Sequence, residues 1–335
     1  MKRTALFLSA WVLPLVLSAC GQNVGWVIKP VPLDERLRET VVASDSGLFV
    51  RDKVVIVDLD GIILNNRHRG LLNWEENPVS LFIEKIDKAE ADDSVKALVV
   101  RINSPGGSVT ASDILYHRLV RFRQARKVPV IAMIEDLGAS GGYYLACGAD
   151  TILAHPTSVT GSIGVIVQAF SLQGTMKLIG VEAKAVTSGQ HKDMLSPFKP
   201  LDPKDMAIVQ AMVDDFYGRF IKVVVANRCS DQAGKKLSQD QVKKLCDGRV
   251  YTGQQALDAG LVDALGYMND AILLAKKRSG ASRVKVVLYD RPMGYNANFY
   301  SQAPVPAAQF NLFNLNVPDL LAAGQPQFLY LWTGQ

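Results

Sequence analysis

The sequence has few cysteine and histidine residues, and their spacing does not match that of a metal site. Four cysteines and four histidines occur among 335 residues, and none has the CxxC or mixed Cys/His spacing typical of a zinc site. No glycine-rich loop ends in the Gly-Lys-Ser/Thr of a phosphate-binding P-loop. We therefore expect this protein to use neither a metal nor a cofactor.

Long runs of one charge are missing as well. Lysine and arginine total 37 against 32 acidic residues, which gives a net charge of +5, and no run of five or more basic residues occurs. This argues against nucleic acid as a partner. Hydrophobic residues make up 48% of the chain, which excludes wholesale disorder, and no internal repeat is present.

The apolar run near the N-terminus is too short to span a membrane. Ala5–Leu17 follows Lys2 and Arg3, and a helix of this length covers roughly 20 Å of a bilayer core of about 30 Å. We predict that residues 1–19 are a secretory signal peptide. The segment ends in Leu-Ser-Ala-Cys, which resembles a bacterial lipobox, so we expect lipid on Cys20 and an exported lipoprotein on the periplasmic side of a membrane.

The rest of the chain divides into three segments. We predict a tether over 20–50, a folded domain over 51–290 and an extended tail over 291–335. Cys147 lies in an apolar stretch and reads as a core residue. Cys229 and Cys246 flank a lysine-rich segment and could pair in an oxidising compartment, a question that the sequence leaves open.

The folded domain has the pattern of an α/β protein with a parallel sheet. Short apolar runs that suit strands buried on both faces alternate with segments of helical periodicity. The predicted strands are Val54–Val57, Ala97–Val100, Val130–Met133, Thr151–Leu153 and Ala183–Thr187. The predicted helices are Val79–Ala91, Ser108–Arg126, Asp202–Arg228, Ser238–Leu245 and Gly253–Ala259. Such alternation implies right-handed βαβ units.

A serine lies at one of the strand-to-helix turns. Gly-Ala-Ser-Gly-Gly, with Ser140 at its centre, follows a predicted strand and precedes an apolar helical run. It also satisfies G-x-S-x-G, the nucleophile-elbow pattern. Small neighbours would let a substrate backbone approach the hydroxyl closely. A plain turn is the alternative interpretation.

A second loop of the same kind precedes Ser108. Asn-Ser-Pro-Gly-Gly ends at Gly107, again between a strand and a helix. Its backbone N–H groups could bind an anion or a developing oxyanion. Because loops in successive βα units leave the same sheet edge, we expect both to belong to one site.

A nucleophilic serine needs a base, and the sequence offers few. The histidines that follow Ser140 are His155 and His191, and a triad through His155 would be strained. Lys192 in a glycine-containing loop is the other option, because Ser–Lys dyads are a known variant. A lysine accepts a proton only when neutral, and an ordinary lysine has a pKa of roughly 10.4, so such a site must desolvate its amine. A solvated surface lysine is the alternative.

Five ordered motifs resemble the signal peptide peptidase family of Ser–Lys serine proteases in its short form. Together with the strands around these motifs, the resemblance covers residues 53 to about 275. The matching segments are Asn103–Gly107, Ala139–Tyr144, Thr160–Val165, Ser188–Pro197 and Gly248–Gly253. The resemblance implies a crotonase/Clp-protease-like spiral of ββα units with additional C-terminal helices.

The resemblance also implies roles for individual residues. Ser140 would be the nucleophile and Lys192 the general base, while Ser162 would orient the lysine. Backbone N–H groups of Gly107 and Gly141 would form the oxyanion hole. The family assembles into rings, so Ser and Lys are expected from adjacent subunits.

The resemblance implies a peptidase that hydrolyses hydrophobic peptides, such as cleaved signal peptides, at the membrane. Two alternatives remain. The fold also hosts acyl-CoA hydratases and isomerases, although export argues against that cytoplasmic substrate. A non-catalytic lipoprotein scaffold is the other.

Overall fold

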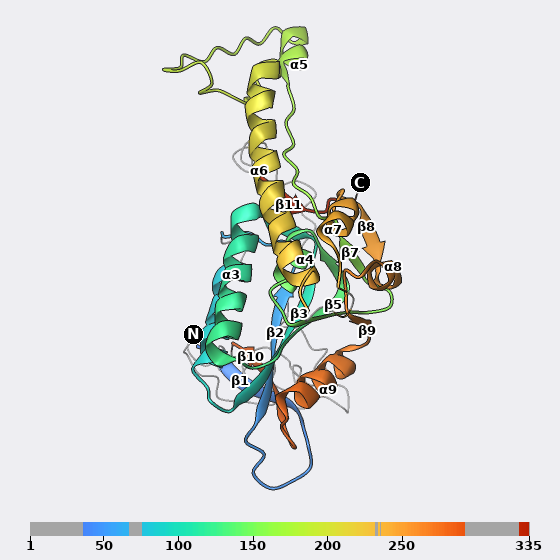
Figure 1. Cartoon of the computed structure of the whole chain (residues 1–335). Coiled ribbons are helices and arrows are strands. Elements are labelled where there is room, and N and C mark those ends of the chain that lie inside the picture. Colours follow the sequence, from blue (N-terminus) through green and yellow to red (C-terminus); the bar gives the residue numbers. More distant parts are fainter. Residues whose placement is uncertain (1–35, 67–75, 232–233, 235, 292–327, 335) are drawn as a thin grey trace, which may run out of the picture. The chain divides into compact units, whose positions relative to one another are not determined.

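The computed structural model describes residues 36–66, 76–231, 234, 236–291 and 328–334. Within them, nine strands form one sheet in the order β1-β10-β2-β3-β5-β6-β9, with β7 paired to β5 and β8 paired to β7 (Figure 1). These strands are β1 (Arg38–Ser44), β2 (Lys53–Asp60), β3 (Val95–Ser104), β5 (Val130–Ala139), β6 (Thr151–Ala154), β7 (Val159–Gly161), β8 (Val250–Thr252), β9 (Ala264–Leu265) and β10 (Lys285–Asp290). A separate pair joins β4 (Gly106–Ser108) to β11 (Leu329–Leu331).

The centre of the sheet is parallel, as the continuous apolar runs predict. β10, β2, β3, β5 and β6 pair in parallel, and only β1 with β10 and β7 with β8 run antiparallel. The runs predicted at 54–57, 97–100, 130–133 and 151–153 lie in β2, β3, β5 and β6. Their side chains are buried on both faces, which explains why no polar alternation interrupts them. The predicted α/β class is confirmed.

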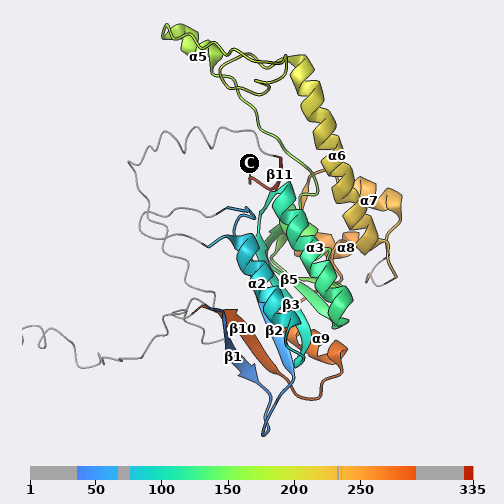
Figure 2. The same cartoon turned by 90° about the vertical axis from the view of Figure 1, so that its left-hand side faces the viewer.

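Helices cover both faces of this sheet (Figure 2). On one face, α2 (Pro78–Glu90), α3 (Val109–Arg126) and α4 (Gly141–Ala146) share a core with alternate residues of β2, β3 and β5. On the other, α9 (Met268–Ser279) packs on the intervening residues. Ser108 caps α3 by accepting a hydrogen bond from the N–H of Ala111 at 3.3 Å. The remaining helices are α5 (Gln173–Leu178), α6 (Pro203–Arg228), α7 (Gln239–Leu245) and α8 (Gly253–Ala259).

The long helix α6 joins this core to an exposed region. Asp202 caps its start by accepting a hydrogen bond from the N–H of Lys204 at 2.8 Å. Near its other end, Phe220 is buried against α4, with its ring 5.0 Å from that of Tyr144. α5 and the segment between α5 and α6 lie beyond the first turn of α6, away from the sheet (Figures 1 and 2). The strand predicted at 183–187 is wrong, because those residues form no strand and are exposed to solvent.

Two described strands lie in segments that the sequence assigned to other roles. β1 falls within the expected tether over 20–50, and it pairs with β10 at the edge of the sheet. β11 falls within the expected tail over 291–335, and its Tyr330 is completely buried. The expected signal peptide over 1–19 and the lipidated Cys20 lie outside the described residues.

Candidate active site

Ser140 occupies a strained turn between β5 and α4. Its backbone has φ 51° and ψ −113°, a left-handed conformation that costs energy for any residue other than glycine. The turn is fixed on both sides, because the Ser140 N–H donates to the carbonyl of Gly161 at 2.7 Å and its own carbonyl accepts from Tyr144 N–H at 2.8 Å. Its side chain makes no capping hydrogen bond to α4. The geometry is that of an elbow that presents a serine hydroxyl.

The two glycine-containing loops touch one another beside this elbow. A Cβ added to Gly106 would lie 2.6 Å from the backbone nitrogen of Gly141, and one added to Gly141 would lie 3.1 Å from that of Gly107. Neither position has room for a side chain, and Gly106 also has φ +99°. The structure therefore brings the backbone nitrogens of Gly107 and Gly141 close together. This agrees with the expectation that both loops leave the same edge of the sheet.

Ser162 lies next to Ser140 at the end of the neighbouring strand. β5 and β7 are parallel, and Ala139 is the register partner of Gly161. Ser140 and Ser162 are the next residues along each strand, and both have positive φ, 51° and 49°. The Ser162 N–H donates to the carbonyl of Arg249 at 2.8 Å, which ties this turn to the residues before β8.

Lys192 lies in the exposed segment between α5 and α6. Its side chain is solvent-exposed, and its N–H donates to the carbonyl of Gly189 at 3.2 Å within a turn. Asp205 in the first turn of α6 accepts hydrogen bonds from His191 at 2.6 Å and from Lys199 at 2.9 Å. These contacts hold both flanks of the turn, and they lower the pKa of Asp205, chiefly through His191.

The structure does not place Lys192 beside Ser140 within one chain. α6 contacts α4 through Phe220, and from there back to Pro203 the helix extends roughly 25 Å at about 1.5 Å per residue. The segment that contains Lys192 lies beyond that far end (Figure 2). Four of the predicted site residues therefore lie together, and the fifth lies apart from them.

His155, the alternative base, has other partners. Its Nδ1 lies 2.8 Å from the hydroxyl oxygen of Thr157, and its ring is edge-on to that of Tyr267 with centroids 4.8 Å apart. These contacts place it in the turn after β6. They do not support a triad with Ser140.

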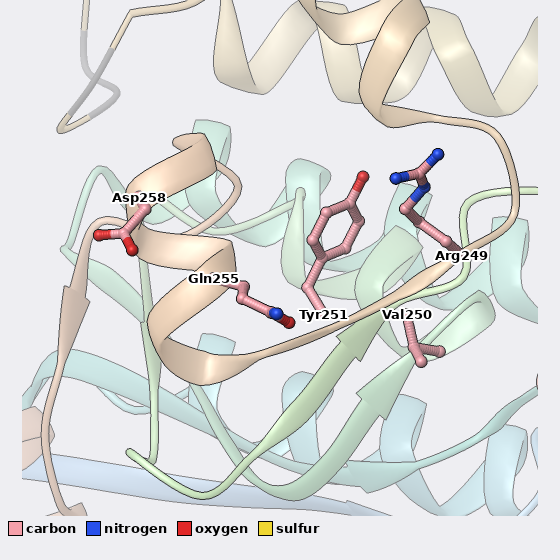
Figure 3. A pocket seen from close by; sticks show the side chains of 5 residues that line it. All are labelled: Arg249, Val250, Tyr251, Gln255 and Asp258. Carbon is pink, nitrogen blue, oxygen red and sulfur yellow. The ribbon is translucent and has the colours of Figure 1, made fainter.

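A pocket open to solvent lies on the outer side of β8. Figure 3 shows the side chains of Arg249 and Tyr251 pointing to one side of this strand and Val250 to the other. Its lining consists of Arg249, Val250, Tyr251, Gln255 and Asp258. Ser140 is not among these residues, so we do not assign the pocket to the candidate active site.

Cys147, Cys229 and Cys246 are free thiols, so the pairing of the last two that the sequence left open is not formed. Burial raises the pKa of Cys147 and of Cys246 to about 12, which makes both inert at neutral pH. Among the described residues, no cluster of three or more acidic, histidine or cysteine side chains could hold a metal. Within the same part of the chain, no helix is long and apolar enough to cross a membrane.

Comparison with known proteins shows which family this chain belongs to. The model of peptidase family S49 matches residues 122–282. A putative protease of Synechocystis is 37% identical over 71% of this chain and 78% of its own length. A putative signal peptide peptidase SppA of Enterococcus faecium is 32% identical over 71% of this chain and 67% of its own length. Protease 4 of Haemophilus influenzae is 35% identical over 68% of this chain, but only 35% of its own length is matched. This chain therefore belongs to peptidase family S49 together with these SppA-like proteins, and it is a serine peptidase.

Proposed function

We propose that the protein cleaves apolar peptides with Ser140 as nucleophile and with Lys192 of a neighbouring subunit as general base. The observation that supports this most is the strained turn of Ser140 beside the converging nitrogens of Gly107 and Gly141. Strain of this kind persists where the surrounding structure enforces it, and it is concentrated at functional sites.

The chemistry follows from these positions. The neutral amine of Lys192 takes the proton of the Ser140 hydroxyl as its oxygen attacks the scissile carbonyl. The N–H groups of Gly107 and Gly141 donate to the oxyanion of the tetrahedral intermediate. The ammonium then returns the proton to the departing amine, which leaves an acyl-enzyme. Water, deprotonated by the same lysine, hydrolyses this ester, and Ser162 orients the amine by hydrogen bonding to it.

Exposed apolar side chains support a second copy of this chain as the partner that buries Lys192. They gather on α5, on the segments flanking it and on the first half of α6, where a monomer would leave them in water. They are Phe170, Leu172, Leu178, Ile179, Val181, Val186, Phe198, Leu201, Met206, Ile208 and Met212. Burial against a second subunit would also favour the neutral form of the lysine amine. Because the candidate site lacks its base within one chain, a ring-shaped homo-oligomer completes it.

The natural substrates that fit this proposal are spent signal peptides at the membrane surface, with the enzyme held there by lipid on Cys20. A Cys20→Ser variant should lose its lipid and its membrane association while it retains cleavage of soluble peptides. Fractionation of cells and mass spectrometry of the mature N-terminus test this. An unlipidated wild-type N-terminus would refute the anchor without affecting the proposed catalysis.

The decisive experiment for catalysis is labelling with a fluorophosphonate, which reacts with activated serines. We expect the label on Ser140 in the wild-type protein and neither label nor peptide cleavage in Ser140→Ala. Ser158→Ala is a matched control, because that serine is buried between β6 and β7 but donates its hydroxyl to the carbonyl of Ile134 at 2.9 Å. Label on another serine, with Ser140→Ala still active, would overturn the assignment.

A further inference from the structure

An ion pair joins α6 to α3 and, through a shared carboxylate, to the helix that follows the candidate nucleophile. Arg219 on α6 donates to both carboxylate oxygens of Asp113 on α3, from Nη2 at 2.8 and 2.7 Å and from Nε at 3.0 Å. The same carboxylate accepts a hydrogen bond from the hydroxyl of Tyr144 on α4 at 2.7 Å. The N–H of Tyr144 in turn donates to the carbonyl of Ser140. Asp113 therefore connects α6 to the elbow of its own chain.

The three helices meet around the side chain of Tyr144. This residue is completely buried, so its hydroxyl needs an acceptor inside the protein. Burial and, after it, the hydrogen bond to Asp113 raise the pKa of the phenol well above its usual value, so it stays protonated and donates. Its ring lies edge-on to that of Tyr116 on α3 and to that of Phe220 on α6, with centroids 5.2 and 5.0 Å apart. The ion pair of Asp113 with the half-exposed Arg219 closes the outer side of this contact.

The first half of α6 is held much less firmly than its second half. Of the described residues 203–215, only Asp205 and Val209 are buried. At the other end of the helix, Arg228 is 1% exposed and forms an ion pair with Asp263. α6 extends from this anchored end away from the sheet (Figures 1 and 2). Its first half is therefore a projecting arm whose direction is set near its C-terminal end.

Two points fix the direction of this arm. Arg228 holds the end of α6, and Arg219 holds a point roughly 14 Å closer to its start. From Arg219 to Pro203 the helix continues for roughly 24 Å, so a tilt of about 10° at the ion pair would move its start by roughly 4 Å. Asp205 binds His191 beside Lys192, so the lysine segment follows that movement. A misplacement of about 1 Å can lower a catalytic rate by about 10²-fold.

Building on the function proposed above, we infer that Arg219 and Asp113 are positioning residues that aim the arm, and with it Lys192, at Ser140 of a neighbouring subunit. They act through the direction of α6 and not by contact with the substrate. An ion pair whose arginine side chain is 58% exposed adds little to the stability of the fold. Its contact with two oxygens, however, fixes an orientation. The shared hydrogen bond from Tyr144 sets that orientation relative to the elbow helix.

Two substitutions loosen the arm by different routes. Asp113→Asn keeps an acceptor for the hydroxyl of Tyr144 but loses the charge, and Arg219→Ala leaves the carboxylate to Tyr144 alone. Each should lower kcat for peptide cleavage at least fivefold with less than a twofold change in KM, because the contacts with substrate persist. Arg118→Ala is the matched control, since this arginine of α3 pairs with Asp87 on α2 at 2.9 Å and should keep the wild-type kcat. A rise in KM with kcat unchanged would contradict the positioning role.

The decisive test determines which subunit needs the ion pair. Chains with Ser140→Ala supply only Lys192, and chains with Lys192→Ala supply only Ser140, so each active site in their mixture joins two different chains. Arg219→Ala added to the lysine-supplying chain should lower the kcat of the mixture at least fivefold. The same substitution in the serine-supplying chain should change it less than twofold, because the arm of that chain carries no base. Sedimentation shows whether both mixtures assemble and exchange to the same extent.

The outcomes separate this inference from the proposed function. Equal losses in the two mixtures, or no loss in either, would show that the ion pair does not aim Lys192, and the inference would fail while the dyad stands. A loss confined to the lysine-supplying chain supports it, because a general defect of folding or of the elbow would affect both mixtures. The parent mixture, with Arg219 intact, tests the proposed function by itself. If it stays inactive despite proven exchange, a base from a neighbouring subunit is refuted, and the inference is refuted with it.

Discussion

Asp205 is a buried carboxylate within an exposed part of the chain. Its side chain is 4% exposed, and it bridges His191 and Lys199, one residue before and seven residues after Lys192. Lys199 also binds Asp193 at 2.7 Å. These ion pairs hold both ends of the turn that contains Lys192, although the turn itself faces solvent. In the proposed mechanism, they would fix the point from which the lysine side chain reaches a neighbouring subunit.

Asp205→Asn should weaken catalysis by loosening this turn. We expect kcat to fall roughly tenfold with little change in KM, since the substituted residue touches no substrate. Asp205→Glu should recover part of the loss because it retains the charge. Asp215→Asn, an exposed residue of the same helix, is the matched control. An unchanged kcat in Asp205→Asn would contradict the positioning role.

Lys192 should be the residue whose loss abolishes activity. Lys192→Ala should lower kcat by about 10³-fold or more, as removal of a catalytic base does. Lys192→Arg should be equally inactive, because a guanidinium stays protonated. Lys184→Ala, an exposed lysine of the same segment, should keep wild-type activity in a steady-state peptide assay. If His155→Ala proved as damaging as Lys192→Ala, a histidine triad would replace the dyad.

At the scale of elements, charged side chains gather in the C-terminal halves of the neighbouring strands β2 and β3. Arg101 is 1% exposed and pairs with Asp58 at 2.6 Å. Asp60 lies in the same group of charged residues. Its burial, followed in importance by the negative charge of Asp58, raises its pKa to about 6. A carboxyl group that holds its proton more tightly in the folded state makes stability fall as pH rises between its unfolded and folded pKa values.

Asp60→Asn should remove this pH dependence. Between about pH 4 and 7 the wild-type protein should lose up to about 3 kcal/mol of unfolding free energy relative to the variant, from a shift of roughly two pKa units. Urea unfolding at several pH values measures the difference, with the exposed Asp93→Asn as control. Parallel curves for wild type and Asp60→Asn would show that the raised pKa does not affect stability.

Elements that depend on local pattern were predictable, and those that depend on a distant partner were not. Four strands could be predicted from the sequence because their burial on both faces of the sheet requires continuous apolar runs. They are β2, β3, β5 and β6. The segment 183–187 has similar residues but finds no neighbouring strand, so it forms none. β4, β7, β8 and β11 have only three residues each in their ladders, too few to produce a detectable periodicity in the sequence.

The same division applies to the candidate site. The proximity of Ser140, Gly107 and Gly141 follows from the rule that parallel strands end at one edge. The role of Ser162 was predicted only from the family resemblance, because a serine that follows a three-residue strand has no distinctive sequence pattern. The separation of Lys192 from Ser140 depends on the length and direction of α6, which sequence spacing does not reveal.

At the scale of the whole molecule, activity should require more than one subunit. Inactive Ser140→Ala and Lys192→Ala chains should regain part of the wild-type rate when mixed and allowed to exchange, because some interfaces pair an intact serine with an intact lysine. Leu178→Asp, which charges a residue 88% exposed on α5, should reduce both assembly and activity. Sedimentation and peptide cleavage measure the two. A mixture that stays inactive despite proven exchange would place the dyad within one chain.

The order of strands at the sheet edge also has a consequence for synthesis. β10 lies between β1 and β2, and β1 has no other strand partner among the described residues. β1 ends at Ser44 and β10 begins at Lys285, so roughly 240 residues separate them. At a translation rate of about 5–20 residues per second, β1 emerges on the order of 10–50 s before the strand that it needs. For that interval the nascent chain offers an unpaired strand, a natural target for chaperones.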